Sequence, residues 1–209
     1  MDNILHCQPT ALDRPRGAHR LEAFSLKAGR RLTLYRQSAP EQWVILEADP
    51  AVIAFCERPG FIQSEGKRYL ADFWVRYFDR QELVILFDLA YERPAKPAAL
   101  LEHAGLTVKV VQSSEIAASR AWIANWKRML PCLIATRSLV PPSLSTAIER
   151  FLARPHRLLS IEREFTTGDP VLVRAAVFGL LHAGRAQAPG LRTHELSLLT
   201  EFVAAGEVV

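Results

Sequence analysis

A near-continuous apolar run, "ELVILFDLA" at residues 82–90, constrains the fold of this chain more than any other feature of its sequence. Such a run is typical of a central strand that is covered on both faces of its sheet. The run contains an acid, Asp88, and the apolar run before it, "YLADFWV" at residues 69–75, contains another, Asp72. Burying an unpaired carboxylate is costly, so each acid needs a partner. Two explanations stay open: structural acids, paired with an arginine or placed at strand ends, and a pair of carboxylates that hold a metal ion.

Periodicity predicts further elements of an α/β unit around these runs. "RRLTLYRQ" at residues 30–37 alternates like a short strand, and "APEQWVILEA" at 39–48 has helical spacing with a proline in its first turn. "AFCERPGFIQ" at 54–63 and "RYLADFWVRYF" at 68–78 predict a hairpin around the turn "SEGK". "LTVKVVQS" at 106–113 predicts another buried strand. The order of these elements favours a mixed sheet flanked by helices.

The second half of the chain predicts mostly helices and a domain boundary. "KPAALLEHAG" at residues 96–105 predicts a helix that ends at Gly105 and has His103 near its C-terminus, and "SEIAASRAWIANWKRMLPCL" at 114–133 predicts a long helix. Two prolines in "SLVPPS" break the pattern, so we expect a second domain at residues 139–209. We expect three short helices there, the second followed by a short strand, as in a small winged-helix domain: "LSTAIERFLA", "DPVLVRAAVFGLLHAG" and "ELSLLTEFVAA".

Charge is distributed unevenly along the chain. Residues 1–40 contain seven Lys and Arg against three acids, whereas residues 139–209 contain seven of each. Residues 1–25 are therefore predicted to be a basic N-terminal arm, which is either a phosphate-binding segment or an ordinary solvated tail. The neutral C-terminal region suits a protein partner better than phosphate. The residues that we expect to bind DNA are Lys27, Arg30, Arg31 and Lys67.

Composition excludes several classes of protein. No apolar run approaches the roughly 18 residues of a membrane span, and the first residues lack a signal pattern, so we expect no membrane contact and no export. Cys7, Cys56 and Cys132 are isolated from one another, which argues against a disulfide framework and against a zinc site. A reducing cytoplasm is the expected compartment.

The predicted order, α-β-β-β-α-β, resembles that of restriction-endonuclease-like nucleases, which we place at residues 26–138. Those enzymes hold Mg²⁺ beside the scissile phosphate with two carboxylates on neighbouring strands. They also need a lysine two residues past the second carboxylate, where strand alternation places both side chains on one face. The lysine orients the attacking water or offsets developing charge.

The chain also resembles one family, the TnsA-type endonuclease subunits of heteromeric bacterial transposases, over roughly residues 20–205. Five segments match that family's motifs in order: "SLKAGRRLTLYRQSAPEQ", "ADPAVIAFCERPGFIQ", "YLADFWV", "ILFDLAYE" and "HAGLTVKVVQSSEI". The resemblance implies double-stranded DNA as one partner and a partner transposase or an ATPase regulator as another. It also implies Mg²⁺ as a weakly bound cofactor.

Carried over residue by residue, the resemblance implies catalytic roles for Glu41, Asp72 and Asp88, with Asp72 and Asp88 as the metal ligands. The lysine position is occupied by Ala90. The helix that bears Glu41 is about two residues shorter than the family pattern, and two residues turn a helix by roughly 200°, so Glu47 is an alternative to Glu41.

Three further positions depart from the family's motifs. Gln37 replaces the first glutamate of the helix motif, Arg58 replaces a glutamine, and Ala71 replaces a proline. Lys67 and Lys109 lie in regions from which a lysine could substitute for the missing one.

These features favour a catalytically impaired, TnsA-like subunit that binds DNA near transposon ends and contacts a partner protein. One alternative is an active Mg²⁺-dependent endonuclease that cleaves the 5′ transposon ends. Another is a DNA-binding or scaffold protein outside transposition that reuses the fold.

Overall fold

The computed structural model describes the chain in segments: residues 8–11, 20–35, 38–64, 67–87, 102–103, 106–165 and 169–206. The chain divides into two compact units, one formed by residues 1–47 and 51–118 (unit 1) and the other by residues 48–50 and 119–209 (unit 2). The two units therefore divide at residue 119, twenty residues before the position that the two prolines predict.

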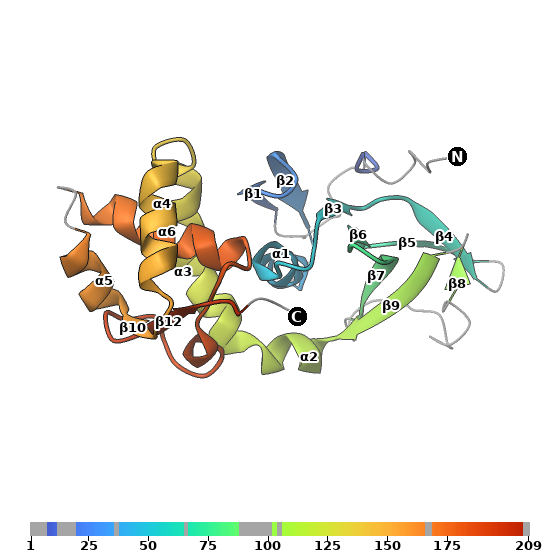
Figure 1. Ribbon diagram of the computed structural model, residues 1–209. Coiled ribbons are helices and arrows are strands. Elements are labelled where there is room, and N and C mark those ends of the chain that lie inside the picture. The colour runs from blue at the N-terminus through green and yellow to red at the C-terminus, as the bar shows by residue number, and fades with distance from the viewer. Residues whose placement is uncertain are drawn as a thin grey trace. The chain divides into compact units, whose positions relative to one another are not determined.

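A five-stranded mixed sheet organises unit 1 (Figure 1). Its strands, in spatial order, are β3 (Ala54–Glu57), β6 (Phe73–Arg76), β7 (Gln81–Phe87), β9 (Leu106–Gln112) and β8 (Glu102–His103). The β3–β6, β6–β7 and β8–β9 pairs are antiparallel, whereas β7 and β9 are parallel. Five consecutive residues of β7, from 82 to 86, are buried. The prediction of a central strand from the apolar run is thus confirmed.

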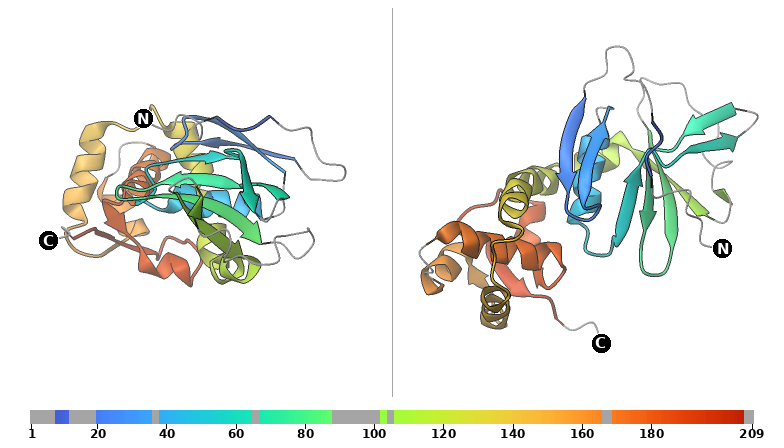
Figure 2. Two further views of the ribbon diagram at one scale, coloured as in Figure 1. Left: turned by 90° about the vertical axis from the view of Figure 1, so that its right-hand side faces the viewer. Right: turned by 90° about the horizontal axis from the view of Figure 1, so that it is seen from above.

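The hairpin prediction is also confirmed. β4 (Phe61–Ser64) pairs with β5 (Lys67–Leu70), and this ribbon continues the β3–β6 pair beyond the sheet (Figure 1, Figure 2). A separate hairpin, β1 (Leu21–Ser25) with β2 (Arg30–Leu34), lies beside α1 (Ala39–Ala48) in both figures. α1 has the predicted bounds. Residues 21–25, which we assigned to the arm, form a paired strand instead.

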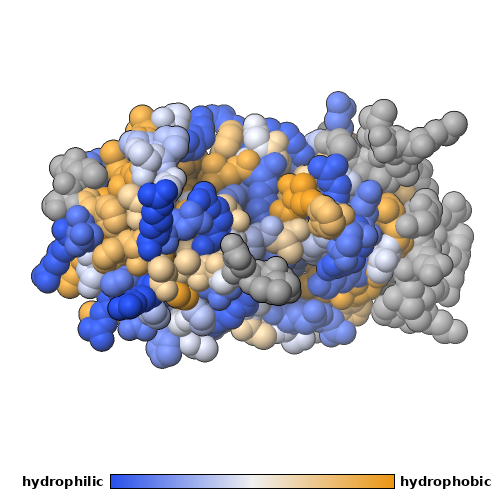
Figure 3. Space-filling model, in the orientation of Figure 1, coloured by the Kyte–Doolittle hydropathy of each residue, from blue (hydrophilic) through white to orange (hydrophobic). Residues whose placement is uncertain are grey.

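Unit 2 combines four helices with a small sheet. The helices are α3 (Arg120–Thr136), α4 (Pro142–Phe151), α5 (Leu158–Glu164) and α6 (Pro170–His182). The three-stranded sheet has the spatial order β10 (His156–Arg157), β12 (Glu201–Ala204) and β11 (Ala186–Gln187), and a 3₁₀ helix, η3 (Pro189–Arg192), follows β11. In Figure 3, apolar residues gather over α4 and α6 among hydrophilic ones. α6 ends before Gly184, whose φ of 72° terminates the helix as predicted.

Three secondary-structure predictions are wrong. Glu102 and His103, placed in a helix, form β8, because pairing with β9 overrides local helix propensity. The long helix at 114–133 is two helices, α2 (Ser113–Ala118) and α3, separated at Ser119. Residues 195–205 are a loop and β12 rather than a helix, because Phe202 is buried and packs against Phe178, with ring centroids 6.4 Å apart. Within the described ranges, no helix is both long and apolar enough to cross a bilayer.

Candidate functional site

A β-bulge interrupts the long ribbon of unit 1. Arg58, Pro59 and Gly60 connect β3 to β4, whereas only Ala71 and Asp72 connect β5 to β6 on the facing side. One strand therefore carries an extra residue, which defines a bulge. Arg58 has a φ of 48°, a left-handed conformation that is uncommon for residues other than glycine. Bulges and strained backbone recur next to functional sites, where they direct a side chain.

Asp72 lies in this bulged connection, directly before β6. Its backbone carbonyl accepts the Arg58 N–H at 2.8 Å, and its own N–H donates to the Val84 carbonyl at 2.9 Å. Its side chain is 8% exposed, and Oδ2 accepts the N–H of Leu86 on β7 at 2.7 Å. The carboxylate therefore adds a hydrogen bond to β7 one residue before β6 begins. This hydrogen bond gives Asp72 a structural role at the end of a strand, which is one of the two explanations that the sequence left open.

The other half of the predicted metal site lies outside the described residues. β7 ends at Phe87, and neither Asp88 nor Ala90 falls in a described range. The convergence of Asp72 and Asp88 thus stays a prediction. Among the residues that the structure describes, no three His, Cys, Asp or Glu side chains form a group that could hold a metal ion.

Glu47 is bound to the β1–β2 hairpin. Its carboxylate is fully buried and accepts three hydrogen bonds: from Ser25 Oγ at 2.6 Å, from the Lys27 N–H at 3.0 Å and from Trp43 Nε1 at 3.2 Å. These bonds hold the turn of the hairpin on α1. Glu41 lies six residues earlier, which places it about 120° away around the helix. The observed bonds give Glu47 a structural role, which favours Glu41 over Glu47 as the helix glutamate of the site.

The predicted DNA-binding cations have different surroundings. Arg30 donates to both carboxylate oxygens of Glu57, at 2.8 and 2.7 Å, and Glu57 is only 2% exposed. These bonds raise the pKa of Arg30 above its usual value. Lys27 Nζ donates to the Leu46 carbonyl at 3.0 Å, and the Arg31 side chain is exposed. Arg31 is therefore better placed than Arg30 to meet a phosphate. Of Lys67, the structure describes the backbone in β5 but not the side chain.

Lys109, considered above as a substitute for the missing lysine, is exposed on β9. It lies opposite Val84 of β7. Val84 is two residues before Leu86, whose N–H binds Asp72. Lys109 is thus on the strand next to β7.

Sequence reasoning missed the structural role of Arg58. Its Nε donates to the Thr10 carbonyl at 3.2 Å, its Nη1 donates to the Thr33 carbonyl, and its guanidinium lies 5.3 Å from the centroid of the Tyr35 ring. The Thr10 N–H in turn donates to the Arg58 carbonyl at 2.8 Å. Arg58 therefore joins residues 8–11 and β2 to the bulge that contains Asp72. The Pro-Gly pair that follows Arg58 is the sequence signal that could have indicated a break in the ribbon.

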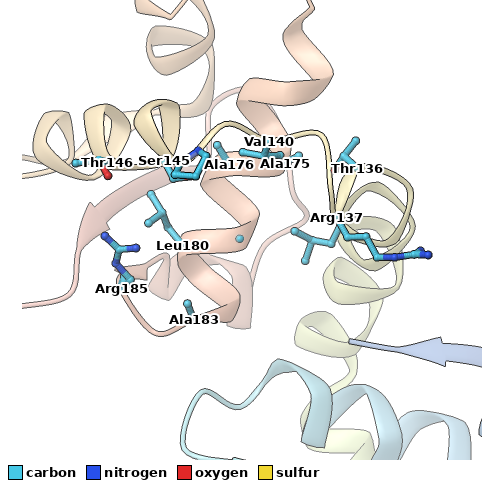
Figure 4. Close-up of a pocket in the computed structure, with 13 residues that line it drawn as sticks. Thr136, Arg137, Val140, Ser145, Thr146, Ala175, Ala176, Leu180, Ala183 and Arg185 are labelled. Carbon is cyan, nitrogen blue, oxygen red and sulfur yellow. The ribbon is translucent and has the colours of Figure 1, made fainter. Parts of the chain in front are cut away.

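Unit 2 contains a groove of about 410 Å³ between α3, α4 and α6 (Figure 4). Small side chains line it, including Ala175 and Ala176 of α6 and Ala183, the residue that follows this helix. Arg185 also lines it, but its Nε and Nη2 donate hydrogen bonds to the carboxylate of Glu149. We call this the α4 groove.

No protein-family model matches the sequence, and no curated protein matches it.

Proposed function

We propose that this chain is a catalytically impaired, TnsA-like subunit of a DNA transposition complex. In this proposal, unit 1 binds DNA near transposon ends beside the remains of a Mg²⁺ site, and unit 2 contacts a partner transposase or regulator. The observation that carries the proposal is the position of Asp72. A buried carboxylate lies at a bulge, at the start of one strand, and is bonded to the neighbouring strand that leads directly to Asp88.

The arrangement of unit 1 supports a restriction-endonuclease-like fold. α1 precedes the sheet in sequence, β3, β6 and β7 form an antiparallel meander, and β9 then pairs with β7 in parallel. The resemblance implies the order α-β-β-β-α-β, and α1, the meander and the parallel β9 fit it, whereas the helix expected between β7 and β9 falls largely outside the described residues. Glu41 lies on α1, the helix that precedes the sheet, as the resemblance implies for the helix glutamate.

The arrangement of unit 2 supports a winged-helix-like domain. Its elements follow the order α3, α4, β10, α5, α6, β11, η3, β12, and β12 lies between β10 and β11. In helix-turn-helix DNA-binding proteins, the recognition helix presents polar side chains to the major groove. Here α6 is largely buried, with Val173, Val177 and Phe178 in the core. A helix whose side chains lie largely in the core is a poor recognition helix, so the proposal assigns a protein partner rather than DNA to unit 2.

Impaired cleavage is proposed because Ala90 occupies the lysine position. Two carboxylates can hold a cation, but alanine cannot position water or offset charge at the phosphate. Losing one preorganised donor from an active site costs roughly 10²–10³ in rate. The second candidate function, an active endonuclease, needs a lysine from elsewhere, and the exposed Lys109 on the strand next to β7 is the described residue that favours it.

A plasmid assay with purified protein and Mg²⁺ or Mn²⁺ tests the proposal. We compare the wild type, Asp72→Asn and Ala90→Lys for DNA binding and for nicking. We expect binding by all three, little nicking by the wild type and more by Ala90→Lys. Nicking by the wild type that Asp72→Asn abolishes would establish the active enzyme instead. Failure of the wild type to bind duplex DNA would contradict both the impaired subunit and the active endonuclease. Neighbouring genes with functions unrelated to transposition would favour a scaffold protein outside transposition.

A further inference from the structure

A second groove in unit 2 has a different character from the α4 groove. It has a volume of about 410 Å³ and lies between α3, the first half of α6 and the loop that leads into β12. We call it the α5 groove, because Leu158, the first residue of α5, is also part of its wall. Its lining is mostly aliphatic and aromatic, and it includes Val171, Phe178 and Leu198.

Large apolar side chains are exposed at the α5 groove. Val171 is 43% exposed and Leu198 is 41% exposed, and both line the groove. Leu199, the next residue, is 64% exposed. Single exposed apolar residues are ordinary on a protein surface, but a group of them around a concave site is typical of a binding surface.

The loop that carries these leucines is held in place. The buried side chain of Asn125 donates to the carbonyls of Leu191 and His194 and accepts the Leu196 N–H, each at 2.8 Å. The Leu198 carbonyl accepts the Leu159 N–H at 2.9 Å. Because these bonds fix the loop in advance, a ligand that binds there meets a preformed surface and loses little free energy in ordering it.

Among the residues that the structure describes, the lining of the α5 groove contains two arginines and no acid. Arg128 and Arg174 both contribute to it. Arg174 is bonded to Glu162, whereas the Arg128–Glu195 pair spans 3.5 Å between side chains that are 57% and 90% exposed. An exposed pair of that length contributes little, so a carboxylate of a ligand can replace Glu195 as the partner of Arg128.

We propose that the α5 groove binds a short segment of a partner protein that carries leucine-like side chains and at least one carboxylate. Charge complementarity selects this ligand, since apolar walls need an apolar face and Arg128, held only by an exposed 3.5 Å pair with Glu195, can accept a carboxylate of the ligand instead. The proposal rests on the proposed function, because it locates the partner contact of unit 2. Duplex DNA is a poorer fit because the exposed leucines would face its phosphates.

A selection from a random library of phage-displayed 12-residue peptides, with the full chain as the target, tests this proposal. We expect enrichment of peptides that combine Asp or Glu with Leu, Ile or Phe. Synthetic copies of these peptides should bind the wild type at least tenfold more tightly than Leu198→Asp, and Arg128→Glu should weaken them similarly. The matched control is Thr146→Asp, an exposed change in the α4 groove, which should leave binding unchanged.

Cys132 supplies an independent readout, since this half-buried cysteine also lines the α5 groove. A bound peptide should slow alkylation of Cys132 by iodoacetamide, measured for that residue by mass spectrometry. Both Leu198 and Leu199 are exposed, so Leu198→Asp and Leu199→Asp should fold like the wild type, and their circular dichroism checks this.

Three outcomes would overturn the proposal. One is a selection without acidic, apolar peptides, and another is binding that Leu198→Asp leaves intact. The third is a wild-type dimer that Leu198→Asp converts to a monomer in sedimentation, which would assign the groove to a second copy of the chain. None of these measurements involves DNA or a metal ion, so the groove and the DNA-binding role can fail separately.

Discussion

Replacing Glu47 should destabilise unit 1 more than any change at its surface. In Glu47→Ala, Ser25 Oγ, the Lys27 N–H and Trp43 Nε1 all lose a charged acceptor. A hydrogen bond to a charged group contributes about 1.5–3 kcal/mol, but Lys27 is only half-buried, so its N–H can recover part of this from solvent. We therefore expect a loss of about 3–4 kcal/mol for Glu47→Ala, a large share of the roughly 5–15 kcal/mol that stabilises a domain. Glu47→Gln keeps one acceptor oxygen and should cost about half as much.

Urea unfolding followed by tryptophan fluorescence measures these changes. Trp43 and Trp74 report on unit 1, and Trp122 and Trp126 report on unit 2, so Trp43 and Trp74 should lose their native signal at lower urea in Glu47→Ala. Asp79→Ala is the control, because Asp79 is 68% exposed and its loss should change stability by less than about 0.5 kcal/mol. A Glu47→Ala protein within about 1 kcal/mol of the wild type would refute the structural role that we assign to Glu47.

Three further predictions follow from named contacts. Arg30→Ala leaves the buried Glu57 carboxylate without its bidentate partner and should cost about 3 kcal/mol in urea unfolding, whereas the exposed Arg31→Ala should cost almost nothing. In DNA binding, Arg31→Ala should flatten the slope of log affinity against log salt by about 0.9, the value for one phosphate contact, and an unchanged slope would show that Arg31 does not contact phosphate. Asn125→Ala removes three hydrogen bonds from residues 191–196 and should speed proteolysis in that segment severalfold, with equal rates contradicting its role as an anchor.

Much of the architecture followed from local patterns. The continuous apolar run predicted β7 at the centre of the sheet, and helical spacing with an early proline predicted α1. Gly184 marked the end of α6, because glycine readily adopts the left-handed conformation that terminates a helix. These elements are predictable since their signals lie within a few residues of each other.

The failures share a physical cause in long-range contacts. β8 exists because β9 offers it a partner, and β12 exists because β10 and β11 flank it, although both segments have helical composition. The pairing of Arg30 with Glu57 spans 27 positions, and no local pattern distinguishes Arg30 from the exposed Arg31 beside it.

The candidate site was predicted only in part. The apolar strand context singled out Asp72, and the structure gives that residue a buried, hydrogen-bonded carboxylate. The bulge at Arg58 was not predicted, because it depends on a one-residue difference between the registers of two strand pairs. Glu47 was the alternative to Glu41 as the helix glutamate, and its bonds to β1 and the following turn depend on a packing that helix periodicity alone does not reveal.

The binding of Mn²⁺ to the wild type and to Asp72→Asn, followed by electron paramagnetic resonance, tests the central claim most directly. Asp72→Asn retains a side-chain oxygen for the Leu86 N–H but removes the negative charge, so the fold should persist while the metal ligand is lost. If Asp72 belongs to the remains of a metal site, the wild type binds one Mn²⁺ weakly, and Asp72→Asn binds none at equal thermal stability. Equal Mn²⁺ binding by the two proteins, or no binding by the wild type, would contradict the account and leave Asp72 as a structural acid at the end of a strand.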